Sequence, residues 1–199
     1  NVGDFQYIIH GASIASPIFY RLHPIETMDA NITALRHLLD YCLEQKKKRK
    51  NVEGFLFYST SEIYGDPTPS NIPTPETYRG NVSCTGPRAC YDESKRYGET
   101  LCVNFSQKHD LPIRIARPFN NYGPRQNHKG YMAGIIPITA FRILSNINPE
   151  IHGSGLQSRD FIYVFDTVDA IIKLYPKMKK GDSVNISTDG QFSMKDIIS

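Results

Sequence analysis

Short apolar segments alternate with longer amphipathic segments along the chain. Apolar runs typical of strands buried in a parallel sheet occur at 7–10 (YIIH), 54–59 (GFLFYS), 113–117 (IRIAR), 159–164 (RDFIYV) and 183–187 (SVNIS). Apolar residues recur at steps of three and four, the spacing of one helical face, at 32–43, 91–105, 132–144 and 167–175. This alternation predicts an α/β fold with a doubly wound parallel sheet, of the Rossmann-like kind.

The residues that follow these strands indicate where a ligand would bind. In a doubly wound sheet, ligands occupy the crevice beyond the carboxyl ends of the strands. Hydroxyl and amide side chains are frequent there, in STSE (59–62), RPFNN (117–121) and NIS (185–187). The loops after the first two of these segments are long for such a fold, and long loops at this end usually carry specificity. A polar small molecule is therefore the expected ligand.

Tyr91 and Lys95 are four residues apart in a predicted helix, within the run GPRACYDESKRYGET. Residues at this spacing lie on one helical face. A free tyrosine has a pKa of about 10, and a fixed cation nearby favours the phenolate. Such a tyrosine can serve as a general base or acid. A surface tyrosine beside a solvated lysine is the alternative, because the spacing alone is common.

Composition and charge exclude several classes of protein. The chain has 199 residues, 40% hydrophobic and 22% charged, which is ordinary for a globular protein with a core. A net charge of +3 does not indicate nucleic acid as a partner, and no apolar run is long enough to cross a membrane. The basic run at 46–50 is interpreted as a solvated helix C-terminus. The four cysteines lack metal-ligand spacing and are typical of reduced thiols, so we expect no metal site and a cytoplasmic location.

Five segments in chain order carry a family resemblance: HGASIASPIFY, STSEIYG, YDESK, RPFNNYGPR and SRDFIYV. Together they resemble the extended short-chain dehydrogenase/reductase family of NAD-dependent nucleotide-sugar epimerases, dehydratases and decarboxylases, over nearly the whole chain. Within that family, ASPIFY (15–20), the Tyr-x-Gly-x-Val run at 78–82 and GPRACYDESKR (86–96) resemble the UDP-glucuronate decarboxylases. The resemblance implies NAD as cofactor, a nucleotide-sugar substrate, above all a UDP-sugar, and a homodimer.

The resemblance also implies a role for individual residues. Tyr91 would be the catalytic base, Lys95 would hold the nicotinamide ribose and lower the tyrosine pKa, and Thr60 would hydrogen-bond the reacting hydroxyl. Glu62 would act as acid or base near the sugar ring. Cofactor contacts are implied for Gly11, Ala12, Asn31, Ser59 and Pro118, in addition to Tyr91 and Lys95. Substrate contacts are implied for Ala15, Tyr20, Ser61, Arg88, Asn120 and Arg159.

The implied chemistry passes through a 4-keto sugar. If C5 carries a carboxylate, the ketone makes it a β-keto acid that loses CO₂, which would convert UDP-glucuronate to UDP-xylose. A nucleotide-sugar 4,6-dehydratase or 4-epimerase begins in the same way and remains an alternative. Ser61 stands where dehydratases acting on dTDP-glucose typically have an acidic Asp, which favours the decarboxylase. A catalytically silent dinucleotide-fold binding module is the alternative from another class.

The resemblance divides the chain into two parts. Residues 1–121 and 159–187 would form an incomplete NAD-binding domain, because the first strand and glycine-rich loop of the family are absent from this chain. Residues 122–158 and 188–199 would form part of the small substrate-binding lobe. The run GSG at 153–155 neither follows a clear strand nor opens a helix, so it predicts a turn.

Overall fold

The computed structural model describes residues 3–50, 52–127, 134–151 and 153–198. The chain forms two compact units. The first contains Asn1–Arg117 and Lys173–Asn185, and the second contains Pro118–Ile172 and Ile186–Ser199. The predicted domains differ from these units at residues 118–121, 159–172 and 186–187, and their assignment to cofactor and substrate remains a prediction.

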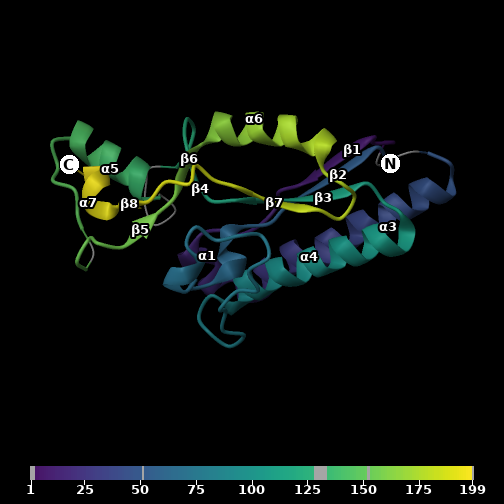
Figure 1. Ribbon diagram of the computed structural model, residues 1–199, viewed down its shortest axis with the longest axis horizontal. Helices are drawn as coiled ribbons and strands as arrows, with labels where there is room; N and C mark the ends of the chain where they lie inside the picture. The colour runs from purple at the N-terminus through teal and green to yellow at the C-terminus, as the bar shows by residue number, and fades with distance from the viewer. Residues whose placement is uncertain (1–2, 51, 128–133, 152, 199) are drawn as a thin grey trace. The chain divides into compact units, whose positions relative to one another are not determined.

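The first unit is built on a sheet with the strand order β1-β2-β3-β7 (Figure 1). The strands β1 (Tyr7–His10), β2 (Gly54–Tyr58) and β3 (Ile113–Pro118) pair in parallel, and β7 (Ser183–Ile186) lies beside β3. All residues of β2 except the last are buried, which explains its unbroken apolar sequence. The predicted parallel sheet is therefore confirmed.

Two long helices pack side by side on one face of this sheet (Figure 1). They are α3 (Ala34–Lys47) and α4 (Ala89–His109). The buried core between helices and sheet consists of Leu35, Leu39, Cys42, Phe55, Phe57, Cys102, Leu111, Ile113 and Ile115. Gly98 lets α4 approach β2 closely, because a Cβ atom there would lie 2.6 Å from Cζ of Phe57. The core thus fixes the position of α4 against the sheet.

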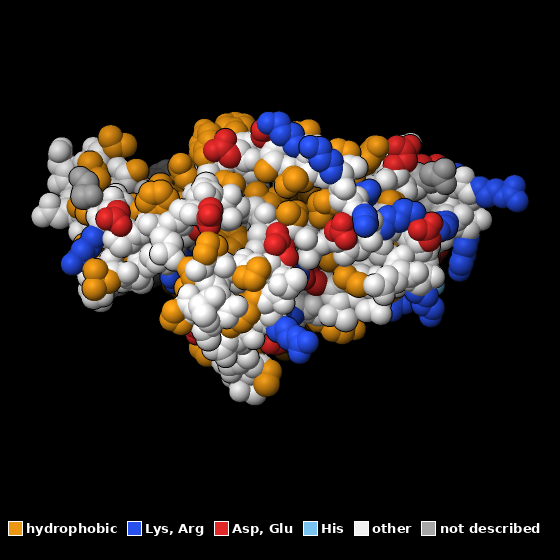
Figure 2. Space-filling view, in the orientation of Figure 1, with side chains coloured by type: hydrophobic (Ala, Val, Ile, Leu, Met, Phe, Trp, Pro, Cys, Tyr) orange, Lys and Arg blue, Asp and Glu red, His pale blue; other side chains and the backbone are white. Residues whose placement is uncertain are grey.

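Three short helical segments before α3 were not distinguished by the sequence pattern. They are α1 (Pro17–Leu22), α2 (Pro24–Met28) and a π-helical turn at Asp29–Thr33. Both α-helices begin with proline, whose fixed φ angle suits the first helical position. They are too short for an apolar repeat to show. The basic run 46–50 is exposed at the end of α3, as expected, and Figure 2 shows Lys and Arg side chains gathered there.

Within its described residues, the second unit contains short strands and three α-helices. The strand β4 (Asn120–Tyr122) pairs in parallel with β6 (Phe161–Tyr163), and β5 (Ser158–Arg159) pairs antiparallel with β8 (Phe192–Ser193). The helices are α5 (Ile135–Leu144), α6 (Val164–Leu174), whose last two residues belong to the first unit, and α7 (Met194–Ile198). Residues 132 and 133 of the predicted helix lie outside the described residues.

Two local predictions in this unit have clear outcomes. Gly153 and Gly155 have φ angles of 70° and 72°, which are those of a turn, so the predicted turn is confirmed. The segment Asn120–Tyr122, predicted as a loop, is a strand. Its polar sequence gave no strand signal, because the pairing with β6 decides its conformation. Across the described ranges, no helix is long and apolar enough to span a membrane.

Candidate functional site

Tyr91 and Lys95 lie in the first two turns of α4 and point toward the carboxyl end of β2. Both side chains are buried, with exposed fractions of 7% and 2%. Nζ of Lys95 donates a hydrogen bond of 2.7 Å to the carbonyl oxygen of Tyr58, the last residue of β2. The same Nζ lies 5.9 Å from the centre of the Tyr91 ring. The structure thus brings the predicted pair together on one helical face.

Thr60 joins this pair from the segment that follows β2. Its backbone is extended, and its hydroxyl caps a 3₁₀ turn at Ser61–Tyr64 by accepting a hydrogen bond of 3.2 Å from the Glu62 amide. The same hydroxyl acts as a hydrogen-bond partner of the Tyr91 phenol and lowers its pKa. The end of β2 therefore carries the groups that contact both Tyr91 and Lys95.

Burial dominates the electrostatics of both residues. The pKa of Tyr91 is raised above its ordinary value because burial disfavours the phenolate, and the effects of Thr60 and Arg88 only oppose this. The lowering of the Tyr91 pKa by Lys95 that the family resemblance implies remains a prediction. Burial also lowers the pKa of Lys95, to about 8. Burial therefore favours the neutral form of both side chains.

Arg88 connects two carboxylates at the start of α4. Its guanidinium forms an ion pair with Glu62, and its Nε lies 3.6 Å from Oδ2 of Asp92. The side chains of Arg88 and Glu62 are 39% and 34% exposed, whereas Asp92 is buried. Burial raises the pKa of Asp92, and Arg88 acts against that effect. The predicted residues Glu62 and Arg88 thus meet at the accessible side of the site, and the sequence gave no sign of Asp92.

Tyr20 packs directly against the predicted catalytic tyrosine. The rings of Tyr20 and Tyr91 are stacked, with centres 5.3 Å apart and planes inclined by 12°. Tyr20 is 1% exposed, and its hydroxyl finds no hydrogen-bond partner among the described residues. Tyr20 thus supports the ring of Tyr91, and its predicted contact with the substrate remains a prediction.

Asn31 is held inside the protein by the π-helical turn before α3. Its side-chain amide donates a 2.8 Å hydrogen bond to Oγ of Ser94, which in turn donates one of 2.9 Å to the carbonyl oxygen of Tyr91. Asn31 therefore connects the π-helical turn, through Ser94, to the first turn of α4. Ser94 was missed by the sequence reasoning, although it lies inside the YDESK segment.

The remaining predicted residues of the first unit lie around the same strand ends. Gly11 and Ala12 are exposed directly after β1, Ala15 is exposed before α1, and Ser61 is half-buried in the 3₁₀ turn. Ser59 is buried, and its hydroxyl has no hydrogen-bond partner within the part of the chain that the structure describes. These positions all belong to segments that leave the carboxyl ends of β1 and β2.

Three predicted residues belong to the second unit. Pro118 is the last residue of β3 and is half-buried. The side chain of Asn120 donates a 2.8 Å hydrogen bond to the carbonyl oxygen of Asp160. Arg159 is exposed and donates one of 2.8 Å to the neighbouring Ser158 carbonyl. Their predicted contacts with cofactor, substrate and diphosphate remain predictions.

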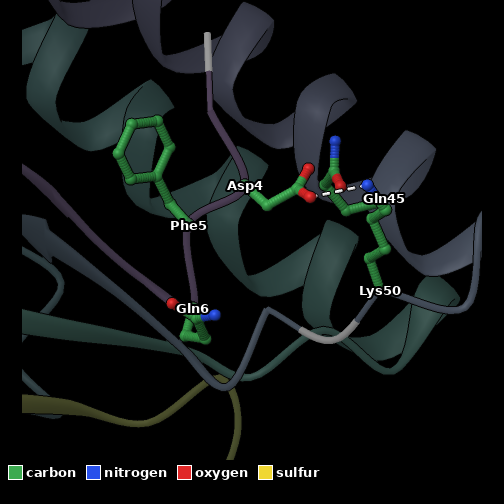
Figure 3. Close-up of a pocket in the computed structure, with 5 residues that line it drawn as sticks. All are labelled: Asp4, Phe5, Gln6, Gln45 and Lys50. Carbon is green, nitrogen blue, oxygen red and sulfur yellow. Dashed lines mark hydrogen bonds and ion pairs between the residues drawn. The ribbon is translucent and has the colours of Figure 1, made fainter.

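A hollow of about 210 Å³ lies at the other end of the sheet (Figure 3). Its lining residues come from the segments before β1 and β2 and from the end of α3: Asp4, Phe5, Gln6, Gln45 and Lys50. None of them is a predicted site residue. The described residues contain no group of His, Cys, Asp and Glu side chains that could hold a metal ion.

A model of the NAD dependent epimerase/dehydratase family matches residues 2–187. The chain belongs to this family. It is 38% identical, over 202 residues, to UDP-glucuronic acid decarboxylase 3 of Arabidopsis thaliana, with coverage of 98% of this chain and 54% of the relative. It is 37% identical to UDP-glucuronic acid decarboxylase 1 of Xenopus tropicalis, with coverage of 86% and 38%. The chain thus spans about half the length, or less, of these curated relatives.

Two solved structures support the same family at the level of the fold. A UDP-glucose 4-epimerase from Thermotoga maritima, solved with UDP-glucose, matches with a TM-score of 0.85 at 28% identity, covering 97% of this chain and 59% of that one. A UDP-N-acetylglucosamine 4-epimerase from Methanobrevibacter ruminantium, solved with UDP-N-acetylmuramic acid, matches with a TM-score of 0.84 at 29% identity, covering 97% and 58%.

Proposed function

We propose that the full-length protein is an NAD-dependent nucleotide-sugar enzyme that works through a 4-keto sugar, most similar to UDP-glucuronate decarboxylase. The observation that carries the proposal is the meeting of Thr60, Tyr91 and Lys95 at the end of β2. No described carboxylate lies within ion-pair distance of the Lys95 ammonium. Such a buried charge is costly, and a structural role alone does not account for it.

The residues at the strand ends fit the nicotinamide ribose of NAD. An ammonium has three N–H donors, and Lys95 uses one of them on Tyr58, so donors remain for ribose hydroxyls. The Ser59 hydroxyl is also uncommitted among the described groups. Lys95 and Ser59 would hold the ribose, and the exposed backbone at Gly11 and Ala12 would line the approach. When bound, NAD supplies the acceptor and donor of a hydride at the sugar C4.

The remaining steps use residues of this chain. Tyr91 would take the proton from the C4 hydroxyl as its phenolate, the form that burial disfavours and a nearby ammonium such as Lys95 favours. Thr60 would orient that hydroxyl by a hydrogen bond. The resulting 4-keto group accepts the electron pair of the bond to the C5 carboxylate, which leaves as CO₂. The enolate that forms then takes a proton at C5, which Glu62 would relay from solvent. Arg88, whose planar guanidinium suits a carboxylate or phosphate, and Glu62 would act at the sugar ring. Tyr91 finally returns its proton to the C4 oxygen.

Epimerisation at C4 is the second candidate. The two epimerase structures named above share 28% and 29% identity with this chain. Epimerisation at C4 would begin with the same removal of a proton and a hydride, so Thr60, Tyr91 and Lys95 would serve that reaction too. Dehydration is less well supported, because Ser61 cannot donate a proton as an aspartic acid would. The silent-module alternative predicts no turnover at all.

We also infer that the protein is a cytoplasmic homodimer in which α3 and α4 pack against the same helices of a second copy. All four cysteines are free, as expected in a reducing compartment. Tyr97 of α4 is half exposed, which leaves an aromatic side chain for such a contact. Light scattering on the full-length protein would give its mass in solution, and a monomeric mass would contradict the dimer.

Product analysis tests the proposed reaction. The full-length protein is incubated with NAD⁺ and UDP-glucuronate, then with UDP-glucose and dTDP-glucose, and the products are identified by mass spectrometry. We expect loss of CO₂ from UDP-glucuronate. Loss of water from a hexose or formation of an isobaric epimer would assign a sister reaction, and no turnover despite bound NAD would support the silent module.

A further inference from the structure

Arg117, near the carboxyl end of β3, is a buried arginine outside the site described above. Its Nε and Nη2 donate hydrogen bonds of 2.8 Å and 2.6 Å to the two carboxylate oxygens of Glu99 in α4. Both side chains of this ion pair are nearly buried, at 10% and 13% exposure. Replacing a buried ion pair by apolar residues is often neutral or stabilising, so stability alone does not explain it.

The remaining amino group of Arg117 reaches the segment that carries Thr60 and Glu62. Its Nη1 donates hydrogen bonds to the hydroxyl of Tyr64 (2.8 Å) and to the carbonyl oxygen of Glu76 (3.0 Å). Tyr64 is the last residue of the 3₁₀ turn that Thr60 begins. The turn is therefore capped by Thr60 at one end and held by Arg117 at the other.

Asn185 of β7 completes the connection. Its side-chain oxygen accepts a 2.7 Å hydrogen bond from the Tyr64 hydroxyl, and its side-chain nitrogen donates one of 2.8 Å to the Thr74 carbonyl. Its backbone amide donates one of 3.0 Å to the Glu76 carboxylate. We call Tyr64, Glu76, Glu99, Arg117 and Asn185 the Arg117 network.

We propose that the Arg117 network is a positioning device that sets the 3₁₀ turn Ser61–Tyr64, and through it Thr60 and Glu62, against Tyr91. This role rests on the proposed function. A single 3₁₀ turn has poor hydrogen-bond geometry and depends on tertiary contacts for its position. Arg96 of α4 adds a second contact, a 2.7 Å hydrogen bond to the Ile63 carbonyl. A displacement of about 1 Å of a catalytic group can cost about 100-fold in rate.

Arg117 is poorly suited to the other role open to an arginine at this end of a sheet, which is binding a phosphate. A guanidinium has five N–H donors. Nε and Nη2 are used on Glu99, and Nη1 is used on Tyr64 and Glu76. The pair of N–H donors that would bind a phosphate is already bound to the Glu99 carboxylate.

Tyr64→Phe in the full-length protein is the sharpest test. It removes the hydroxyl that connects Arg117 to Asn185 and keeps the ring, over which the guanidinium lies at 5.4 Å. We expect kcat to fall about 10- to 100-fold with KM changed less than about 2-fold. We also expect the apparent pKa of Tyr91 in the pH–rate profile to rise, because its contact with Thr60 weakens.

Tyr175→Phe is the matched control. Tyr175 also lies against an arginine of β3, with Arg114 at 4.4 Å from its ring, and its hydroxyl bonds the Pro112 carbonyl. The Tyr175→Phe substitution should leave kcat unchanged. Arg117→Lys keeps the positive charge but loses the planar guanidinium and its paired hydrogen bonds to Glu99, so we expect kcat to fall in this variant too. Unchanged kcat in both Tyr64→Phe and Arg117→Lys would overturn the proposal.

Hydrogen exchange separates this proposal from the proposed function. In Tyr64→Phe, amides in residues 61–79 should exchange at least about 10-fold faster than in the unsubstituted protein, since local opening follows the loss of local contacts. The Tyr175→Phe variant should not show this acceleration. An unsubstituted protein without activity would contradict the proposed function, and the exchange rates would still decide this inference. Unchanged exchange in Tyr64→Phe would overturn it.

Discussion

The two ends of the sheet in the first unit differ in how they hold charge. At the amino end, charged side chains pair near the surface: Lys50 and Asp4 are both more than half exposed and border the hollow of Figure 3. Lys46 at the end of α3 donates to the carbonyl oxygens of His109 and Asp110. Such pairs contribute little free energy, commonly about 0–1 kcal/mol, and cost little to desolvate.

At the carboxyl end, charged and polar side chains are buried. Lys95, Asp92 and Arg117 are each less than 10% exposed, and burial shifts the pKa of Lys95 and of Asp92 toward the neutral form. Burying a charge without full pairing costs several kcal/mol. The carboxyl end therefore holds groups that destabilise the fold, whereas the amino end does not. This contrast identifies the carboxyl end as the functional one more directly than the size of any hollow.

Among the substitutions that test this difference between the two ends, Tyr91→Phe should have the largest effect on activity. Removal of the phenol hydroxyl from the proposed acid–base group should lower kcat by about 10²- to 10⁴-fold. The melting temperature should change little, because the ring remains stacked on Tyr20. Tyr41→Phe removes an amino-end hydroxyl that bonds the Gly3 carbonyl, and should keep full activity. Steady-state kinetics of the full-length variants measure both, and equal activities would remove the distinction between the two ends.

Lys95→Met should abolish activity and stabilise the protein. The folded-state pKa of about 8 lies below the ordinary 10.5, so the folded protein bears the cost of the buried ammonium below pH 8. The two values differ by about 2.5, and each pKa unit corresponds to about 1.4 kcal/mol, which gives a gain of at most about 3.5 kcal/mol at pH 7. The lost hydrogen bond to Tyr58 reduces that gain.

The stability gained by Lys95→Met should decrease as the pH rises. As pH rises from 8 to 10.5, the folded wild-type protein releases the Lys95 proton before the unfolded chain does, so wild-type stability increases. The advantage of Lys95→Met should therefore shrink over this window. Urea unfolding of the full-length protein at pH 7 and pH 9.5 measures this. A variant less stable than the wild type at pH 7 would show that the ammonium is well paired in the fold.

Gly98→Ala should destabilise the contact between α4 and β2. The added Cβ would lie 2.6 Å from Cζ of Phe57 and 3.3 Å from Cδ2 of Leu35, both in the core. Overpacking of this kind costs about 1–3 kcal/mol. At Gly54, on the amino end of β2, a Cβ would meet the rings of Tyr7 and Tyr175.

Gly54→Ala is the matched comparison for this prediction. The added Cβ would lie 2.5 Å from Oη of Tyr175 and 2.8 Å from Cδ1 of Tyr7. Tyr7 is 64% exposed, and the Tyr175 atom is the far end of a half-buried side chain, so both can move aside and we expect a loss below about 1 kcal/mol. Thermal melting of both variants provides the comparison. A larger loss for Gly54→Ala than for Gly98→Ala would show that the amino end is the more tightly packed.

The sequence predicted what depends on neighbours along the chain. The unbroken apolar runs identified the strands of the sheet, and the spacing of Tyr91 and Lys95 placed them on one face because helical geometry is local. The polar run 59–62, which contains Thr60, was noted because it lies at the end of a strand, and the family resemblance singled out Thr60 within it. The family resemblance added the roles of these residues, which spacing alone does not supply.

The features that the sequence did not predict depend on distant partners or on burial. Arg117 and Glu99 are 18 residues apart, and Tyr64 and Asn185 are 121 apart, so no local pattern connects them. The raised pKa of Tyr91 follows from its burial, which outweighs the lowering effects of Thr60 and Arg88. The position of Tyr20 depends on stacking across separate helices. Tertiary packing, which no residue spacing reports, decides each of these.

The smallest predicted effect concerns the ion pair between Asp4 and Lys50 at the amino end. Asp4→Asn removes a pair whose side chains are 54% and 53% exposed, so we expect a loss of less than about 1 kcal/mol, screened further by added salt. Asp40→Asn, which breaks the exposed pair with Arg36, should behave alike. Urea unfolding at low and high salt measures both. A salt-independent loss above about 2 kcal/mol in Asp4→Asn would mean that charge is held as tightly at the amino end as around Lys95, and burial of charge would no longer distinguish the two ends.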